Sequence, residues 1–186
     1  MSSLTDNDVL WYAMSATYRS EMKIRDNLVA RGVECYLPLH TVEKTLRGRK
    51  VRVDVPLVSN LIFVHSSRHD IQKFKQELPH LQYKMWHAAG QAPQPITVRE
   101  RDMANFMTAT VDFPQVQVKV LDRPAVPAGA RVRITGGPMN GLYGILSRQA
   151  GSRSHRITVT LDRLCSLQIV IPRGLVEFVD DKETSE

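Results

Sequence analysis

The sequence predicts an α+β protein of two domains, a ferredoxin-like split βαβ domain followed by a small β-barrel. Segments of strand and helix periodicity alternate in the order β-α-β-β-α-β-α up to residue 112. A proline-bearing segment follows, and beyond it only short strands separated by glycine-containing turns occur. We therefore expect an N-terminal domain at 8–112, a linker at 113–127 and a C-terminal domain at 128–181.

The elements of the N-terminal domain follow from their periodicity and stop signals. Gly32 ends the first helix and Pro79 ends the second, while Thr97 and Glu100 form a capping box that opens the third. A continuous apolar run at 60–65 predicts a buried central strand. The predicted strands lie at 10–16, 33–37, 60–65 and 81–85, and the first two helices at 20–31 and 71–78.

A basic hairpin tip is predicted at 42–52, between the second and third strands. Its five cations are Lys44, Arg47, Arg49, Lys50 and Arg52. Such a charged run is by default a solvated loop, but basic hairpins also reach nucleic-acid phosphates. Both interpretations remain open from the sequence alone.

The C-terminal domain is predicted from strict alternation of apolar and polar residues in which β-branched side chains dominate. Its strands are expected at 130–135, 142–148, 156–161, 164–171 and 175–179. The runs Gly136-Gly137-Pro138 and Pro172-Arg173-Gly174 would break a long helix at a cost of roughly 1 kcal/mol per glycine and 3 per proline. We therefore expect a constitutive β-structure, held by a semi-rigid linker.

Composition limits the class of protein. The chain has 186 residues, 42% of them hydrophobic, a formal charge of +6 and a pI near 9.5, a balance that favours a polyanionic partner. No run is long enough for a membrane helix, and the N-terminus is not a signal peptide. Cys35 and Cys165 are expected to be reduced thiols of a cytoplasmic protein.

Nothing in the sequence proposes an enzyme, a metal or a cofactor. No nucleophile elbow, P-loop or His-Glu-x-x-His motif occurs, and the carboxylates are scattered singly. His65 and His69 have i, i+4 spacing, but His65 falls in a predicted strand and no third ligand accompanies the pair. We expect a binding protein.

The most specific pattern lies at 129–144 and reads Gly-x-x-Val-x-Ile-x-x-Gly-Pro-x-x-Gly-x-x-Gly. It resembles the KOW motif, which is carried on a small SH3-like barrel. Together with Trp11-Tyr12 at the head of the α/β domain and the stretch 55–64, it makes the chain similar to the NusG family of transcription elongation factors over residues 10–179. The resemblance implies an N-terminal NGN domain joined to a KOW domain.

One departure from the family pattern is informative. Housekeeping members carry Pro-Gly-Tyr before the central strand, whereas this chain has Ser59-Asn60-Leu61. That replacement, with Pro56 upstream, is similar to specialised paralogs of the UpxY type, which act as antiterminators on surface-polysaccharide operons. Asn60 can supply the turn that glycine would.

The resemblance implies partners and contact residues. The NGN domain of the family sits on the clamp of RNA polymerase and suppresses pausing, and the KOW domain recruits a ribosomal protein or a termination factor. By position, the polymerase-binding patch would comprise Trp11, Tyr12, Leu57, Val58 and Leu61, and the KOW partner surface Leu161, Asp162, Arg163 and Leu164. We expect a monomer that also contacts DNA or the backbone of nascent RNA.

Two alternatives remain from the residues themselves. Trp11 and Tyr12 would point to opposite faces of a strand, so at least one of them is expected in the core. A KOW-containing ribosome-associated or RNA-binding protein is the alternative function, and it would not need the Trp-Tyr strand with an apolar patch.

Overall fold

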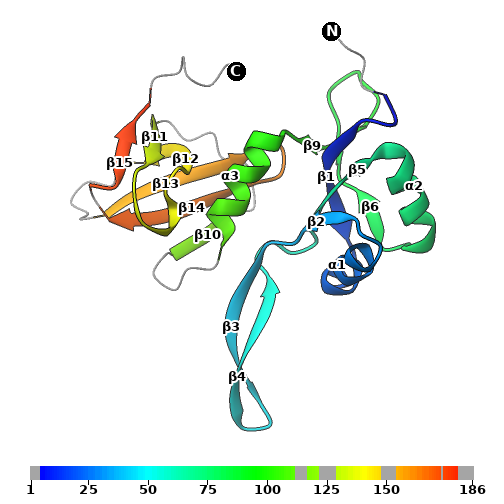
Figure 1. The fold of residues 1–186 in the computed structure, drawn as a ribbon, viewed down its shortest axis with the longest axis horizontal. Helices are drawn as coiled ribbons and strands as arrows, with labels where there is room; N and C mark the ends of the chain where they lie inside the picture. The colour runs from blue at the N-terminus through cyan, green and yellow to red at the C-terminus, as the bar shows by residue number, and fades with distance from the viewer. Residues whose placement is uncertain (1–4, 112–116, 122–128, 148–153, 173, 180–186) are drawn as a thin grey trace. The chain divides into compact units, whose positions relative to one another are not determined.

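The computed structural model describes residues 5–111, 117–121, 129–147, 154–172 and 174–179. The chain divides into two compact units, Met1–Met103 and Ala104–Glu186. The division falls inside a helix and not at the proline-bearing segment that the sequence suggested. Each unit is described by itself (Figure 1).

The first unit is built on an antiparallel sheet in which β1 (Val9–Ala16) is an internal strand. Its order is β2 (Glu34–Tyr36), β5 (Ile62–Ser67), β1 and β6 (Leu81–Tyr83), and β9 (Thr97–Val98) also pairs with β1. Strand β5 separates β1 from β2, which is the split βαβ arrangement. The ferredoxin-like order predicted from the sequence is therefore present in this unit.

Two helices pack on one face of this sheet. α1 (Glu21–Ala30) contributes Ile24 and Leu28 to the core, and α2 (Arg68–Glu77) contributes Ile71. They meet alternate residues of β1, among them Tyr12 and Met14. The Ser67 hydroxyl caps α2 by accepting from the Asp70 N–H at 3.1 Å. The i, i+3, i+4 spacing of the buried residues explains why these segments are helical.

Two small hairpins lie outside this sheet. β3 (Leu39–Leu46) and β4 (Arg49–Pro56) form a two-stranded hairpin of their own, and β7 (Met85–Trp86) pairs with β8 (Gln94–Pro95). In Figure 1 the β3–β4 hairpin extends away from the other elements of its unit.

The third helix begins later than its capping box suggested. α3 spans Glu100–Thr110, and the Met103 N–H donates to the Arg99 carbonyl at 2.9 Å. Thr97, the predicted cap, instead lies in β9 opposite Tyr12 of β1. Cross-strand pairing with a buried strand outweighs the local capping signal, so the start of the helix moves by two residues.

A six-stranded sheet forms the second unit. Its order is β10 (Gln117–Leu121), β14 (Cys165–Pro172), β13 (Ser154–Leu161), β12 (Tyr143–Ser147), β11 (Ala130–Ile134) and β15 (Val176–Phe178). Within the described residues the end strands β10 and β15 do not pair, so the predicted closed barrel is not seen there. β10 pairs along β14 and places part of the predicted linker in this sheet.

The strand periodicity predicted for this unit is confirmed. The apolar residues that alternate along β11, β13 and β14 are buried, namely Val132, Ile134, Ile157, Val159, Leu161, Leu167, Ile169 and Ile171, and Thr158, Cys165 and Ser166 are buried beside them. A short 3-10 turn, η1 (Gly137–Met139), occupies the Gly-Pro break. The segment is therefore β-structure and not a helical hairpin. No described helix is long and apolar enough to cross a membrane.

Candidate nucleic-acid interface

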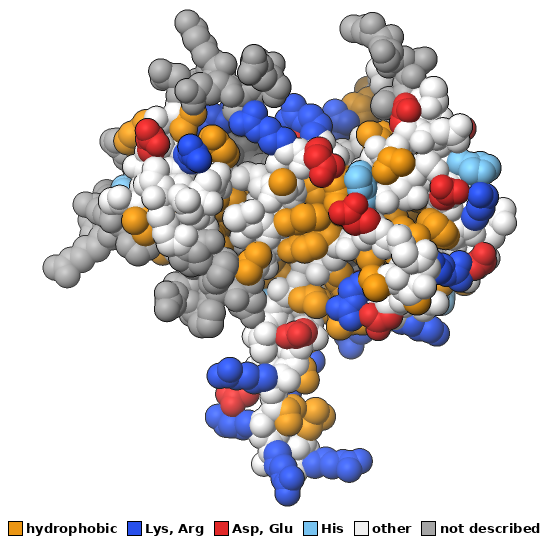
Figure 2. Space-filling view, viewed as in Figure 1, with side chains coloured by type: hydrophobic (Ala, Val, Ile, Leu, Met, Phe, Trp, Pro, Cys, Tyr) orange, Lys and Arg blue, Asp and Glu red, His pale blue; other side chains and the backbone are white. Residues whose placement is uncertain are grey.

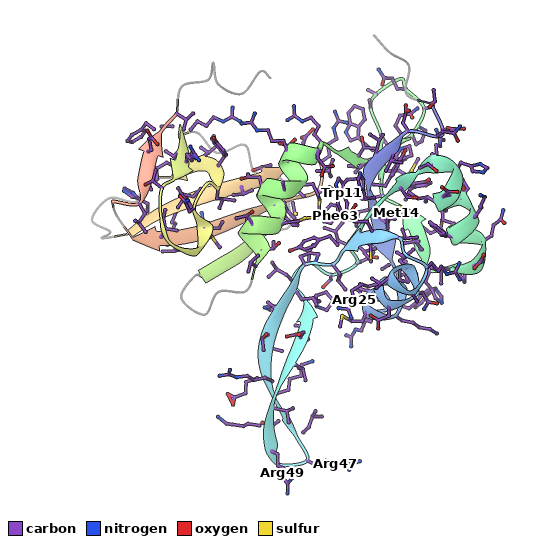
Figure 3. All side chains as sticks on the ribbon, in the orientation of Figure 1. Trp11, Met14, Arg25, Arg47, Arg49 and Phe63 are labelled. Carbon is purple, nitrogen blue, oxygen red and sulfur yellow. The ribbon has the colours of Figure 1, made fainter. Side chains whose placement is uncertain are left out.

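The β3–β4 hairpin closes through a turn that only a few residues can form. Arg47 and Gly48 occupy the two central positions, with φ of +51° and +76°. Two consecutive residues with positive φ match the type I′ turn, whose twist suits the flanking strands. The turn places Arg47 at the tip of the hairpin, and Arg49 is the first residue of β4 after the turn (Figure 3).

The two faces of the hairpin differ in chemistry. Val42 opposes Val53, and Lys44 opposes Val51, so one face mixes valines with cations. The other face carries polar pairs. The Thr41 hydroxyl donates to Asp54 at 2.8 Å, and the Lys50 ammonium lies 3.5 Å from the Glu43 carboxylate. Because one face is apolar near the base only, the distal half of the hairpin is solvated on both sides.

All five predicted contact cations lie on this hairpin and all are exposed. The hairpin holds five Lys and Arg residues against Glu43 and Asp54, a net charge of +3 out of the chain's +6. Figure 2 shows the blue side chains gathered towards the end of the hairpin. Among the described residues, Arg47 and Arg49 have no carboxylate within 4.0 Å. The structure therefore brings the sequence-predicted cluster together on one protruding element.

A groove at the base of the hairpin adds a feature that the sequence did not predict. It has a volume of about 520 Å³ and is lined by Arg19, which precedes α1, by Met22 of α1, by Val42, Lys44 and Val55 of the hairpin, and by Ser59. Arg19 has a left-handed φ of +55°. A positive φ at a non-glycine residue is rare, and no motif marks it in the sequence.

The apolar patch predicted for polymerase binding is not a single exposed surface. Trp11 is 2% exposed, Tyr12 5% and Leu61 1%. Tyr12 belongs to the core under α1 and α2, whereas the strand alternation puts Trp11 on the opposite face with Phe63 (Figure 3). Tyr12 is therefore a core residue, in line with the expectation that at least one of the two aromatic residues packs inside the fold.

The second face of the sheet carries a stacked pair that sequence analysis missed. The Trp11 indole lies against the His65 imidazole, with centroids 4.7 Å apart and planes 10° from parallel. His65 Nδ1 lies 2.6 Å from a carboxylate oxygen of Glu34 on β2, and Nε2 lies 3.8 Å from Glu100. The contacts of His65 are thus with carboxylates and an aromatic ring, and His69 lies on another element, α2. Among the described residues no group of three metal-type ligands forms.

Leu57 and Val58 lie in the turn between β4 and β5 and are half-buried. The turn is built around Asn60, whose φ of +57° confirms that asparagine supplies the left-handed position expected of it. Its backbone N–H donates to a carboxylate oxygen of Glu21 at 2.9 Å, and Glu21 is only 5% exposed. The buried Glu21 carboxylate, by accepting this hydrogen bond, therefore fixes the conformation of the turn that carries Leu57 and Val58.

Burial raises the pKa of two tyrosines in the first unit. Desolvation, with a smaller contribution from neighbouring Tyr12, raises the pKa of Tyr83 to about 12. Desolvation likewise raises the pKa of Tyr12. The two rings lie 5.6 Å apart, centroid to centroid, and Lys75 sits over the Tyr83 ring. Both rings pack in the core under α1 and α2.

The predicted partner residues of the C-terminal unit form the turn between β13 and β14. Leu161 is buried and faces inward, while Asp162 and Arg163 are exposed and Leu164 is half-buried. The Leu164 N–H donates to the Leu161 carbonyl at 3.1 Å, and Arg163 takes a φ of +64° to close the turn. Leu161 is therefore a core residue, and the other three lie at the surface of the turn.

Comparison with known proteins gives one family. The family model described as "Transcription termination factor nusG" matches residues 10–107, which is more than half of the chain. No curated protein matches the sequence. Among solved structures, one titled "Domain interaction in Thermotoga maritima NusG" is similar at 18% identity and a TM-score of 0.47, covering 93% of this chain and 98% of that one.

A second solved structure, titled "Crystal Structure of MjSpt4:Spt5 complex conformation B", is similar at 13% identity and a TM-score of 0.29, covering 92% of this chain and 97% of that one.

Proposed function

Because this chain belongs to the NusG family of transcription factors, we propose that it is an elongation and antitermination factor that binds RNA polymerase and suppresses pausing or termination. The observation that carries the proposal is the β3–β4 hairpin, which presents five exposed cations on one protruding element.

The hairpin is proposed as the nucleic-acid contact. Arginine and lysine contacts to phosphates supply affinity that falls with salt and carry no base sequence. The two carboxylates lie outside the turn, Asp54 near the base of the hairpin and Glu43 opposite Arg52, on the face opposite Lys44. The tip is thus the more strongly positive part, and we propose that it reaches DNA or the backbone of nascent RNA.

Polymerase binding is proposed for the first unit, on the surface around the turn between β4 and β5. Of the five residues predicted for that contact, Leu57 and Val58 are the two with partly exposed side chains. Half-buried apolar residues held by a structured turn are suited to anchor an interface. Trp11, Tyr12 and Leu61 support this surface from within the fold.

Val58→Asp is expected to weaken binding to the clamp region of RNA polymerase about 30-fold, the equivalent of a hot-spot loss of roughly 2 kcal/mol. The matched control is Val29→Asp, which places the same charge at an exposed valine of α1. Biolayer interferometry with purified polymerase measures both. Equal affinity for Val58→Asp and the control would remove this turn from the interface.

The specialised role is proposed from the turn before β5. Ser59-Asn60-Leu61 stands where housekeeping relatives have Pro-Gly-Tyr, and Asn60 takes the left-handed φ that glycine would. The local fold is preserved while the residues at the turn differ. We therefore propose a factor of the UpxY type, acting on surface-polysaccharide operons, whose C-terminal unit is a KOW domain that recruits a ribosomal protein or a termination factor.

Co-purification tests the proposed function against its alternative, a ribosome-associated or RNA-binding protein. The tagged full chain is captured from lysate after nuclease treatment, and the captured complexes are identified by mass spectrometry. Recovery of RNA polymerase subunits supports the elongation factor. Recovery of ribosomal subunits without polymerase would favour the alternative.

A further inference from the structure

The net positive charge of the β3–β4 hairpin lies on one of its faces and on the turn. Opposed residues of an antiparallel pair share a face, and successive pairs alternate between the two faces. One face holds two cations and two carboxylates, which cancel, in the pairs Thr41 with Asp54, Glu43 with Arg52, and Thr45 with Lys50. The other face, here called the valine face, consists of the pairs His40 with Val55, Val42 with Val53, Lys44 with Val51, and Leu46 with Arg49. With histidine counted as neutral, the valine face has a charge of +2, and Arg47 at the turn adds the third charge.

The outer half of the valine face combines each cation with an apolar side chain. Val51 lies opposite Lys44, and Leu46, which is 56% exposed, lies opposite Arg49. Among the described residues neither cation has a carboxylate within 4.0 Å. Figure 2 shows hydrophobic side chains beside Lys and Arg along the hairpin. A ligand on this face therefore meets one cation and one apolar side chain at each outer pair.

The hairpin has the form of a free two-stranded ribbon. β3 and β4 have eight residues each, about 26 Å of strand, and among the described residues they pair only with each other. The ribbon extends away from the other elements of its unit (Figure 1). The major groove of B-DNA is about 12 Å wide and admits a two-stranded β-ribbon. The hairpin therefore has a shape that can enter that groove.

The base edges in the major groove match the chemistry of the valine face. A guanidinium donates two hydrogen bonds to O6 and N7 of guanine, and apolar side chains contact the C5-methyl group of thymine. Arg49 and Leu46 supply these two kinds of group beside the turn. The opposite face is neutral and carries its own contacts, such as the ion pair of Lys50 with Glu43, so it suits exposure to solvent. Phosphate contacts alone would not require apolar side chains next to the cations.

We propose that the hairpin enters the major groove of duplex DNA with its valine face towards the base pairs, so that Arg49 reads guanine and Leu46 contacts thymine methyl groups. This inference rests on the proposed nucleic-acid contact of the hairpin and deepens it, because it makes that contact selective for bases and for the duplex. Arg52, on the opposite face, takes no part in the reading of bases.

Fluorescence anisotropy of the full-length chain with four labelled DNA duplexes tests the inference. The duplexes are of equal length and consist of guanine–cytosine, inosine–cytosine, adenine–thymine or adenine–deoxyuridine pairs. Inosine keeps O6 and N7 in the major groove but lacks the amino group that guanine shows in the minor groove, so it separates the two grooves. We expect the guanine and inosine duplexes to bind equally, each about tenfold more tightly than the deoxyuridine duplex. The thymine duplex should bind about fourfold more tightly than the deoxyuridine duplex, which lacks the methyl groups.

Three variants assign the reading to single side chains. Arg49→Lys keeps the positive charge but loses the two-pronged donor. It is expected to abolish the preference for guanine over deoxyuridine duplexes while leaving the slope of log Kobs against log salt unchanged. Leu46→Ser should abolish only the preference for thymine over deoxyuridine. Arg52→Lys is the matched control, since it makes the same replacement on the opposite face, and it should change neither preference.

Several results would overturn the inference. Equal affinity for all four duplexes, or for none of them any measurable affinity, excludes reading of bases in the major groove. An inosine duplex that binds like the thymine duplex and not like the guanine duplex would place the contact in the minor groove. A single strand that binds as tightly as its duplex, or an Arg49→Lys variant with an undiminished guanine preference, also overturns it. Salt-dependent binding without a base preference would leave the proposed phosphate contact in place and remove only the reading of bases.

Discussion

Gly144→Val is expected to destabilise the C-terminal unit strongly while the stability of the N-terminal unit is unchanged. A Cβ atom built on Gly144 would lie 2.3 Å from the Ile157 Cγ2 atom and 2.9 Å from the Thr158 carbonyl oxygen. The β13 strand, which carries both of these atoms, cannot move away without breaking its hydrogen-bonded ladder with β12. We expect a loss of about 3 kcal/mol or more in the free energy of unfolding of this unit.

Calorimetry on the full-length chain measures the effect, with a fall of roughly 12 °C or more in the unfolding temperature of the C-terminal unit. Both tryptophans, Trp11 and Trp86, lie in the first unit, so their fluorescence reports separately that this unit stays folded. Ala130→Val is the matched control, because it adds methyl groups at an exposed position of β11. An unfolding temperature for Gly144→Val within 2 °C of the control, roughly the effect of a few tenths of a kcal/mol, would contradict the packing described for β12 and β13.

The triple replacement of Arg47, Arg49 and Lys50 by alanine is expected to weaken nucleic-acid binding strongly and to flatten its salt dependence. Each lost phosphate contact lowers the slope of log Kobs against log salt by about 0.7 to 0.9, so three contacts lower it by about 2 to 3. Affinity for free polymerase should be retained, since the proposed protein contact lies at Leu57 and Val58 and not at the hairpin tip.

Fluorescence anisotropy with labelled single- and double-stranded DNA, over a range of salt concentrations, measures this slope. The control variant removes the same charge elsewhere, by replacing Arg31, Lys73 and Arg99 with alanine; each lies beside a carboxylate in the first unit. Stability should change little, because Lys50 makes one exposed ion pair, worth about 0 to 1 kcal/mol. A hairpin triple with the same slope as the control would reduce the hairpin to a solvated loop.

Much of the fold follows from local patterns. The strands of the C-terminal sheet, the two helices under the first sheet and the left-handed Asn60 were all predicted, because each depends on periodicity or on the preference of one residue. The hairpin charges are also visible in the sequence, since exposed cations need no tertiary partner to be recognised.

The features that were missed depend on long-range contacts. Thr97 reads locally as a helix cap, but pairing with β1 draws it into a strand. The run that forms β10 reads as part of a linker in the sequence, because its pairing partner β14 lies far away along the chain. Burial of Trp11 and Leu61 could not be distinguished from exposure, since an apolar residue in a strand looks the same on a packed face and on a binding face.

The most direct test of the account is the half-life of a defined pause during transcription by purified RNA polymerase, measured with and without the protein. We expect the full-length chain to shorten the pause and the Arg47, Arg49 and Lys50 triple variant to lose most of that effect while still binding polymerase. A wild-type protein that leaves the pause half-life unchanged at saturating concentration would contradict the proposal that it is an elongation factor.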